Sequence, residues 1–164
     1  MDFNSIEELK DNGFTGFKTV KELWRDKSCI PKTMGVYIVI NPNYSNTKFI
    51  NPGVGGFFKG KDPNVEIDEL KMNYVSDSKV VYIGKAGGIN VNATLHSRLG
   101  QYLRFGKTKN VGHAGGRYIW QIKDYDKLLF CWKEIIGNEP ENIERDLINS
   151  FIGKYGKMPY ANLR

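Results

Sequence analysis

The 164-residue sequence has only two cysteines, no long apolar run and no acidic residue in one stretch of 44 residues. Cys29 and Cys131 stand far apart, which excludes a disulfide scaffold and a Cys-rich metal cage. The longest apolar runs, such as 35–40 and 128–132, are far too short to span a bilayer. A basic segment followed by an apolar signal region is also lacking at the start. We therefore expect a protein of the reducing cytoplasm, with no secretory signal and no membrane partner.

The remaining composition is that of a globular domain. Hydrophobic residues make up 40% of the chain and aromatic residues 13%, which is enough for a core and disfavours intrinsic disorder. A chain of this length falls within the usual range of about 100–200 residues for one domain, so we expect a single domain over residues 1–164. No G-x-x-x-x-G-K-[ST] motif is present, so a P-loop nucleotide cofactor is not expected.

The net charge of +6 comes from one part of the chain. Residues 80–123 contain no acidic residue, and both histidines, His96 and His113, lie among them. Chance clustering is one explanation for this window. The other is an electrostatic footprint for phosphates, with aromatic residues interleaved among the charges. The basic residues of the window are Lys85, Arg98, Arg104, Lys107, Lys109, Arg117 and Lys123.

The first 34 residues are expected to form a helical extension. Ser5 and Glu8, and again Thr19 and Glu22, have the spacing of a capping box at a helix start. Gly13 is placed to end the first of these helices. The pattern therefore predicts two short helices before the first strand.

The rest of the chain predicts an α+β fold, with a small central antiparallel β-sheet of about three strands flanked by helices. β-branched and aromatic runs predict the strands, and apolar residues at helical spacing predict the helices. Residues 117–122 are compatible with either a short helix or a strand. The expected strands are 35–40, 80–84 and 127–136, and the expected helices are 94–105 and 140–156, with an insertion at 41–79 that contains a short helix near 65–74.

The last of these helices places a carboxylate on its apolar face. At 100° per residue, Glu144 falls near the centre of the stripe that contains Ile148 and Phe151, whereas Asp146 points away. A buried carboxylate is destabilising unless it is paired or bound to a cation. One interpretation is a structural ion pair, or a first helical turn that extends past the core. The other is a metal ligand at the floor of a cleft.

Five short motifs then occur in a fixed order over residues 35–162. This ordered set resembles the GIY-YIG nuclease superfamily, in particular its small stand-alone bacterial or phage type. About forty residues separate the two tyrosine strands, where that family usually has a short hairpin. The motifs are Gly35-Val-Tyr37, Tyr82-Ile-Gly84, Arg98-Leu99, Glu144-Arg-Asp-Leu-Ile148 and Pro159-Tyr-Ala-Asn162.

The resemblance implies a metal-dependent DNA endonuclease that hydrolyses phosphodiester bonds with Mg²⁺ or Mn²⁺. It implies that Glu144 is the metal ligand and that Arg98 contacts the scissile phosphate. Tyr37 would orient or deprotonate the attacking water, although an ordinary tyrosine is a poor base at pH 7. The implied catalytic set is Tyr37, Tyr82, Arg98, Tyr102, Glu144 and Asn162.

The expected partner is DNA, double-stranded and contacted through the basic window. The alternative function is a catalytically silent nucleic-acid-binding module of the same fold, and a third is a protein-interaction domain. Residues 113–117 also resemble a stretch of small bacterial members of the superfamily, but the resemblance gives them no role. The residues expected to bind nucleic acid are Lys85, Arg104, Lys107, Lys109 and Arg117.

Overall fold

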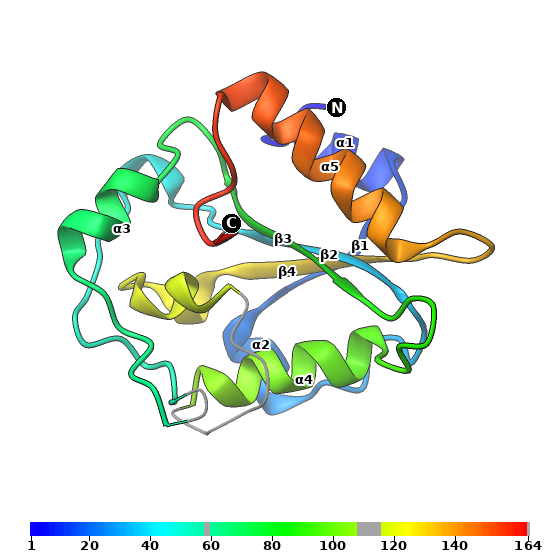
Figure 1. Ribbon diagram of the computed structural model, residues 1–164, viewed down its shortest axis with the longest axis horizontal. Coiled ribbons are helices and arrows are strands. Elements are labelled where there is room, and N and C mark those ends of the chain that lie inside the picture. The colour runs from blue at the N-terminus through cyan, green and yellow to red at the C-terminus, as the bar shows by residue number, and fades with distance from the viewer. Residues whose placement is uncertain (58–59, 108–115, 164) are drawn as a thin grey trace.

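The computed structural model describes residues 1–57, 60–107 and 116–163, and Figure 1 shows its elements. The chain forms one antiparallel sheet of four strands in the order β1-β4-β2-β3, with helices against it. The α+β architecture is confirmed, but the expected count of about three strands was one too low. The strands are β1 (Thr15–Thr19), β2 (Gly35–Ile40), β3 (Val80–Ala86) and β4 (Leu129–Glu134).

The strand that the sequence did not predict is β1, which pairs with β4 at one edge of the sheet. It is only five residues long, and its register shifts between Gly16 and Lys18. Gly16 and Phe17 both have positive φ, at 95° and 55°, so the strand lacks regular alternation. Gly16 also lies against the Trp132 ring, and a Cβ there would come within 2.7 Å of it. A hydrophobic periodicity cannot detect a strand of this kind.

The observed helices lie close to the positions that the sequence predicts. Ser5 caps the first of them by accepting from the Glu8 amide, and Thr19 and Glu22 form a complete capping box on the second. The left-handed Gly156 ends the last helix, and the helical alternative for residues 117–122 is confirmed as a 3-10 turn. The helices are α1 (Ile6–Asp11), α2 (Val20–Arg25), α3 (Ile67–Asn73), α4 (Leu95–Phe105) and α5 (Pro140–Tyr155), with 3-10 turns at Tyr44–Asn46, Arg117–Gln121 and Tyr125–Lys127.

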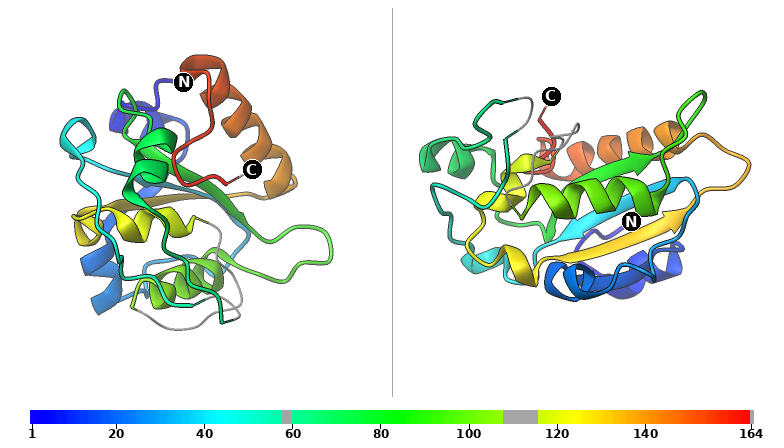
Figure 2. Two further views of the ribbon diagram at one scale, coloured as in Figure 1. Left: turned by 60° about the vertical axis from the view of Figure 1, so that its left-hand side comes forward. Right: turned by 90° about the horizontal axis from the view of Figure 1, so that it is seen from below.

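The sheet separates two hydrophobic cores. Helices α2 and α4 cover one face, and α1 and α5 cover the other, as the views in Figures 1 and 2 show. The first core contains Tyr37, Leu99 and Trp120, and the second contains Ile38 and Phe151. Because strand β3 is the outer strand on its side, α4 and α5 approach the same sheet edge from opposite faces. This edge is where residues from the two layers can meet.

A buried glutamine joins two parts of the insertion at 41–79 to the core. Gln121 accepts from the Val65 amide and donates to the carbonyl oxygens of Ile50 and Val65. The predicted short helix within the insertion is confirmed as α3. In the part of the chain that the structure describes, no helix has the length and apolar character that crossing a membrane requires.

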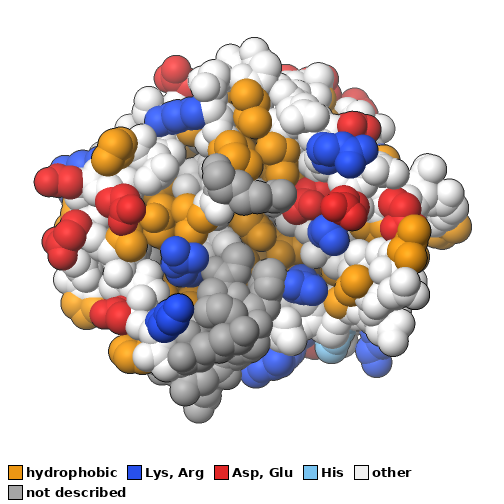
Figure 3. All heavy atoms as spheres, in the orientation of Figure 1, with side chains coloured by type: hydrophobic (Ala, Val, Ile, Leu, Met, Phe, Trp, Pro, Cys, Tyr) orange, Lys and Arg blue, Asp and Glu red, His pale blue; other side chains and the backbone are white. Residues whose placement is uncertain are grey.

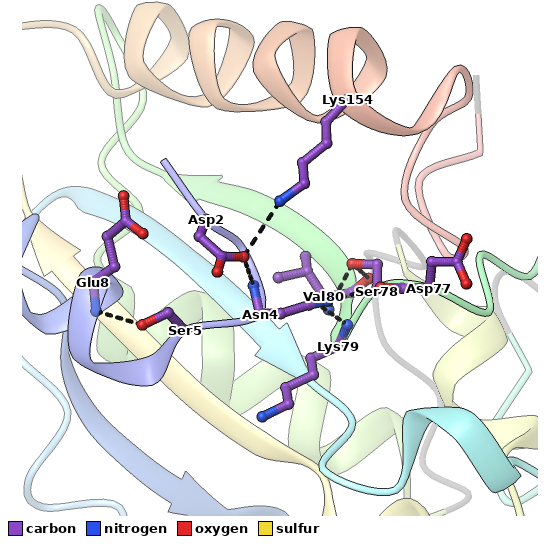
Figure 4. Close-up of polar contacts among 9 residues, drawn as sticks. All are labelled: Asp2, Asn4, Ser5, Glu8, Asp77, Ser78, Lys79, Val80 and Lys154. Carbon is purple, nitrogen blue, oxygen red and sulfur yellow. Dashed lines mark hydrogen bonds and ion pairs between the residues drawn. The ribbon is translucent and has the colours of Figure 1, made fainter.

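The N-terminal segment is fastened to the start of β3 and to α5 (Figure 4). The Asn4 side chain donates to the Asp77 carbonyl at 2.7 Å and accepts from the Lys79 amide at 2.8 Å. Lys154 of α5 forms an ion pair with Asp2 at 3.3 Å, and both side chains are substantially exposed. These contacts place the first residues against the α1/α5 layer.

Candidate active site at the edge of strand β3

Tyr37 and Gly84 face each other across strands β2 and β3 and define the centre of the site. A Cβ on Gly84 would lie 2.6 Å from Tyr37 Cζ and 2.7 Å from its hydroxyl oxygen. The Tyr37 ring therefore crosses over Gly84, which only glycine permits. Because β3 is the edge strand, the ring extends towards the outer edge of the sheet. The Tyr82 ring lies beside it, with the centroids 5.8 Å apart.

Arg98 and Glu144 both influence the pKa of Tyr37, which places them in the same site. Burial raises the pKa of Tyr37 well above its ordinary value of 10, and Tyr82 adds to the rise through its charge and a hydrogen bond. The Arg98 guanidinium opposes this rise in pKa, whereas the Glu144 carboxylate contributes to it. Three of the predicted catalytic residues, Tyr82 of β3, Arg98 of α4 and Glu144 of α5, thus act on the Tyr37 hydroxyl.

Glu144 is buried on the inner side of α5, with 8% of its surface exposed. This agrees with the helical pattern, which also placed Asp146 outside, where it is exposed. The carboxylate lines a groove of about 240 Å³ along α5, whose floor includes Ile148 and Met158. Figure 3 shows acidic side chains beside Lys and Arg side chains on this face, between α5 and α4. The buried carboxylate is therefore next to open, partly charged surface.

The surroundings of Tyr102 give this residue a structural role. It is buried among aromatic rings and lies 5.7 Å from the Tyr82 centroid and 6.5 Å from that of Tyr37. Its hydroxyl donates a short hydrogen bond to the Gly116 carbonyl oxygen. Burial raises the pKa of Tyr102 well above its ordinary value, and Tyr82 and Tyr37 add to the rise. Tyr102 therefore supports the two tyrosines of the site and anchors the 3-10 turn that follows Gly116.

Asn162 is bound to the outer side of β3. Its amide donates to the Ile83 carbonyl oxygen at 2.9 Å and accepts from the Ile83 amide at 3.0 Å, as a neighbouring strand would. The Ala161 amide likewise donates to the Val81 carbonyl oxygen at 2.8 Å. Asn162 thus fixes the strand segment that carries Tyr82 and Gly84, which makes it a positioning residue for the site.

The predicted nucleic-acid contacts are spread over several elements. Lys85 is half-buried on β3, directly after Gly84, and Arg117 is half-buried with its guanidinium 5.6 Å from the Tyr118 ring centroid. Arg104 and Lys107 are exposed on and just after α4, and the Lys107 ammonium lies 5.2 Å from the Trp24 ring centroid. Lys109 lies outside the described residues. The structure therefore gives four of the five predicted cations partly or fully exposed positions.

One cation near α4 was not predicted from the sequence. Lys27 Nζ lies 3.6 Å from the position of a Cβ on Gly100, and Arg104 Nη1 lies 3.5 Å from the same point. The two positive groups thus converge beside Gly100 of α4. Lys27 precedes the acid-free window, so the charge count could not identify it. The sequence feature that could have drawn attention to this place is Gly100. A glycine inside a helix is destabilising by about 1 kcal/mol relative to alanine, so its presence in α4 calls for a reason.

The described residues contain no group of three or more His, Cys, Asp or Glu side chains placed to hold a metal ion. A cation at Glu144 would therefore take most of its ligands from water and from the substrate. Mg²⁺ is commonly bound in this way, through one or two carboxylates together with phosphate oxygens.

Comparison with known proteins gives no relative. No protein-family model matches the chain, and neither a curated protein nor a solved structure shows significant similarity to it.

Proposed function

We propose that this protein is a metal-dependent DNA endonuclease that hydrolyses phosphodiester bonds with a GIY-YIG-like site. The observation that carries the proposal is the convergence of Tyr37, Arg98 and Glu144 at the edge of β3. They come from β2, α4 and α5, and their numbers in the chain span more than a hundred positions. A hydroxyl, a guanidinium and a carboxylate that lie close together can orient water, bind a phosphate and bind a cation.

In this proposal Arg98 binds the scissile phosphate. A guanidinium presents a planar fork of donors that matches two phosphate oxygens, and its charge does not titrate in the physiological range. It also stabilises the additional negative charge that develops on the phosphate as water attacks. The half-buried position of Arg98 on α4 supports this role, because a partly desolvated cation interacts more strongly with an anion.

Tyr37 acts as a neutral hydrogen-bonding group in this proposal. Its raised pKa keeps the phenol protonated at neutral pH, so it is unsuited to remove a proton from water. A buried neutral hydroxyl can still orient the attacking water or hold a phosphate oxygen. Of the two roles that the sequence left open for Tyr37, the pKa supports orientation.

The donor set at Glu144 fits Mg²⁺, and also Mn²⁺, since both prefer oxygen ligands. The carboxylate is buried on its protein side and lines a groove on the other, so it offers a hard anionic ligand at an accessible surface. When bound, the cation would polarise the phosphate and stabilise its developing charge. Glu144 is the residue that would hold it.

The charge distribution supports DNA as the substrate. The window 80–123 has seven basic residues and no acidic one, and it contains Lys85 and Arg98 of the site. Phosphate backbones bind such surfaces by releasing counterions, which makes the affinity fall steeply with salt. We therefore expect DNA binding that weakens strongly between low and physiological ionic strength.

Nicking of supercoiled plasmid in the presence of Mg²⁺ tests the proposal. Glu144→Gln removes the anionic ligand, and Arg98→Lys keeps the charge but loses the planar fork of donors, so each should lower the nicking rate by about 10²–10³-fold. Asp146→Asn provides the matched control, because Asp146 is exposed on the same helix and faces away from the groove. Its nicking rate should equal that of the wild type.

Two results would overturn parts of the proposal. Wild-type protein that binds DNA but never cuts it, with Mg²⁺ or Mn²⁺ and with several substrates, would identify a silent binding module. Nicking that survives in Glu144→Gln would leave an endonuclease whose metal site lies elsewhere.

A further inference from the structure

Three loops meet at the end of the sheet nearest the site and carry exposed apolar side chains. They precede β2, follow β3 and follow β4, and they lie together at the right of Figure 1. Figure 3 shows hydrophobic side chains on the surface at this end, with both acidic and basic side chains near them. We call these side chains the apolar rim: Met34 (37% exposed), Ile89 (72%), Val91 (41%) and Ile136 (88%).

The rim is held by specific contacts between its loops. The Ile135 amide donates to the Met34 carbonyl oxygen at 3.1 Å, and the Ile89 amide donates to Glu139 Oε2 at 3.1 Å. Gly87 packs so closely on Met34 that a Cβ there would lie 2.4 Å from the Met34 side chain. These contacts hold the loops beside one another, while the four apolar side chains remain 37–88% exposed.

Two acidic residues also fasten the rim, Glu134 at the end of β4 and Glu139 just before α5. Glu139 accepts from the Ile89 amide, and Glu134 accepts from the Thr33 hydroxyl at 2.6 Å. Both hydrogen bonds lie at the surface, so the rim has acidic as well as basic neighbours. The nearest predicted phosphate-binding residues are Lys85, one residue before the end of β3, and Arg98, in the first turn of α4. An apolar edge beside cations matches a nucleic acid, which presents phosphates outside and base stacks inside.

The rim is also close to the catalytic residues. Gly35, Ala86 and Glu134 are paired at this end of the sheet, and Tyr37 lies two residues further along β2. At about 3.4 Å per residue, Met34 is therefore about 10 Å from Tyr37 along the strand. Helix α4, which carries Arg98, and helix α5, which carries Glu144, both begin at these loops.

We propose that the apolar rim inserts between base steps of DNA bound at the site, and that the preferred substrate is DNA whose stacking is already weak. This inference rests on the proposed function. Isoleucine and methionine wedges unstack and kink DNA in proteins that bind the minor groove, at a cost that falls when the step is flexible or mismatched. A second protein chain is a poorer fit, because stable interfaces use about 20–30 residues a side and the rim is four side chains.

The test uses Glu144→Gln as a background, so that DNA is bound without being cut. Its affinity is measured for a fully paired duplex and for the same duplex with one central mismatch, in which 2-aminopurine beside the mismatch reports unstacking. We expect the mismatched duplex to bind more tightly and its 2-aminopurine fluorescence to rise on binding. Adding Ile136→Ser or Ile89→Ser should weaken binding to the mismatched duplex about tenfold and abolish the fluorescence rise.

The salt dependence distinguishes a wedge from a phosphate contact. Neither isoleucine touches a phosphate in the proposal, so the slope of log affinity against log salt should stay unchanged in the serine variants. Met72→Ser is the matched control, because Met72 is 73% exposed on α3, outside the rim. It should leave the affinity, the fluorescence and the salt slope as they are.

The failure of this inference is separable from the failure of the proposed function. If Ile136→Ser and Ile89→Ser behave like Met72→Ser while the wild type still nicks plasmid, the wedge is wrong and the nuclease stands. A change in the sedimentation of either variant without DNA would show that the rim joins two copies of this chain, which also overturns the wedge. A wild type that neither binds nor cuts DNA would overturn both proposals.

Discussion

The two faces of the sheet are packed with different kinds of side chain. Under α2 and α4 the core is rich in tyrosine and tryptophan, and the ring of Tyr102 touches those of Tyr37, Tyr82 and Trp120. Under α1 and α5 the sheet contributes aliphatic residues and a buried cysteine. The first face therefore buries many hydroxyl groups that need partners, whereas the second is packed chiefly by apolar side chains, among them Phe3 and Phe151.

This difference assigns separate tasks to the two layers. The aromatic layer supplies the hydroxyl and guanidinium groups of the site, and the aliphatic layer supplies a single buried carboxylate, Glu144. A change deep in the aliphatic layer should lower stability without altering the site. A change in the aromatic layer beside Tyr37 should alter both.

The largest loss of stability is expected from Leu9→Ala in α1, because Leu9 is fully buried in the aliphatic core. Removing a buried leucine side chain lowers the free energy of unfolding by about 2–5 kcal/mol. Urea unfolding measures this loss, with exposed Asp11→Ala as the control. At a temperature where the variant is folded, its plasmid-nicking rate should match that of the wild type. A reduced rate in folded Leu9→Ala would contradict the separation of the two layers.

Gly84→Ala should affect both properties. The new Cβ would overlap the Tyr37 ring, and displacing that ring should lower the free energy of unfolding by about 1–3 kcal/mol. Nicking should fall far more than in Leu9→Ala, because the Tyr37 hydroxyl moves relative to Arg98 and Glu144. Unfolding and nicking are measured on the same preparation. Full nicking activity in Gly84→Ala would show that the position of Tyr37 is unimportant.

Asn162→Ala removes two hydrogen bonds from the Ile83 backbone at the sheet edge. We expect the free energy of unfolding to fall by about 1–2 kcal/mol, because water can replace part of what is lost. Hydrogen exchange of the Ile83 amide should accelerate more than that of Ile38 in the central strand β2. Equal acceleration at both amides would indicate global destabilisation in place of a local role.

Alkaline pH should destabilise the aromatic layer. The pKa of Tyr37 and that of Tyr102 are raised by burial, whereas both tyrosines ionise near pH 10 in the unfolded chain. The folded state therefore holds more protons above pH 10, so this stabilisation is complete below pH 10 and decreases as the pH rises further. Urea unfolding from about pH 9 to pH 11, with tyrosinate absorbance recorded in parallel, measures it. Ionisation of every tyrosine near pH 10 in folded protein would contradict the packing described.

The smallest effect is expected from Lys154→Ala. Its ion pair with Asp2 lies on the surface, where solvent and salt screen the attraction. The midpoint of urea unfolding should be indistinguishable from that of the wild type. A clear shift would show that the attachment of the N-terminal segment contributes more to the α1/α5 layer than its exposure indicates.

The sequence predicted the elements whose signals are local. Strand β2 and helix α5 have continuous apolar or helical periodicity together with clear start and stop residues, and both were located correctly. The burial of Glu144 followed from the same periodicity. Strand β1 was not predicted. Its backbone has positive φ angles and a register shift, so its residues do not show the alternating hydrophobic pattern of a regular strand.

The contacts within the site depend on strand register, which the sequence does not encode locally. The motifs placed Tyr37 and Tyr82 near each other, but the facing residue of Tyr37 is Gly84, and the passage of its ring over that glycine follows from the pairing. The hydrogen bonds that join Tyr102 to Gly116 and Asn162 to Ile83 are likewise tertiary contacts. Composition and spacing can identify such residues, but they do not predict which residues these contact.

The attachment of residues 161–162 to β3 has a consequence for association between molecules. An open sheet edge offers free amide and carbonyl groups on which a strand from another chain can add, the first step of many aggregates. Here the Val81 carbonyl and both Ile83 backbone groups are already bonded from outside. At the opposite edge the irregular backbone around Gly16 gives β1 a bulge, which is poorly suited to pairing. Both edges of this small sheet are thereby protected against strand addition.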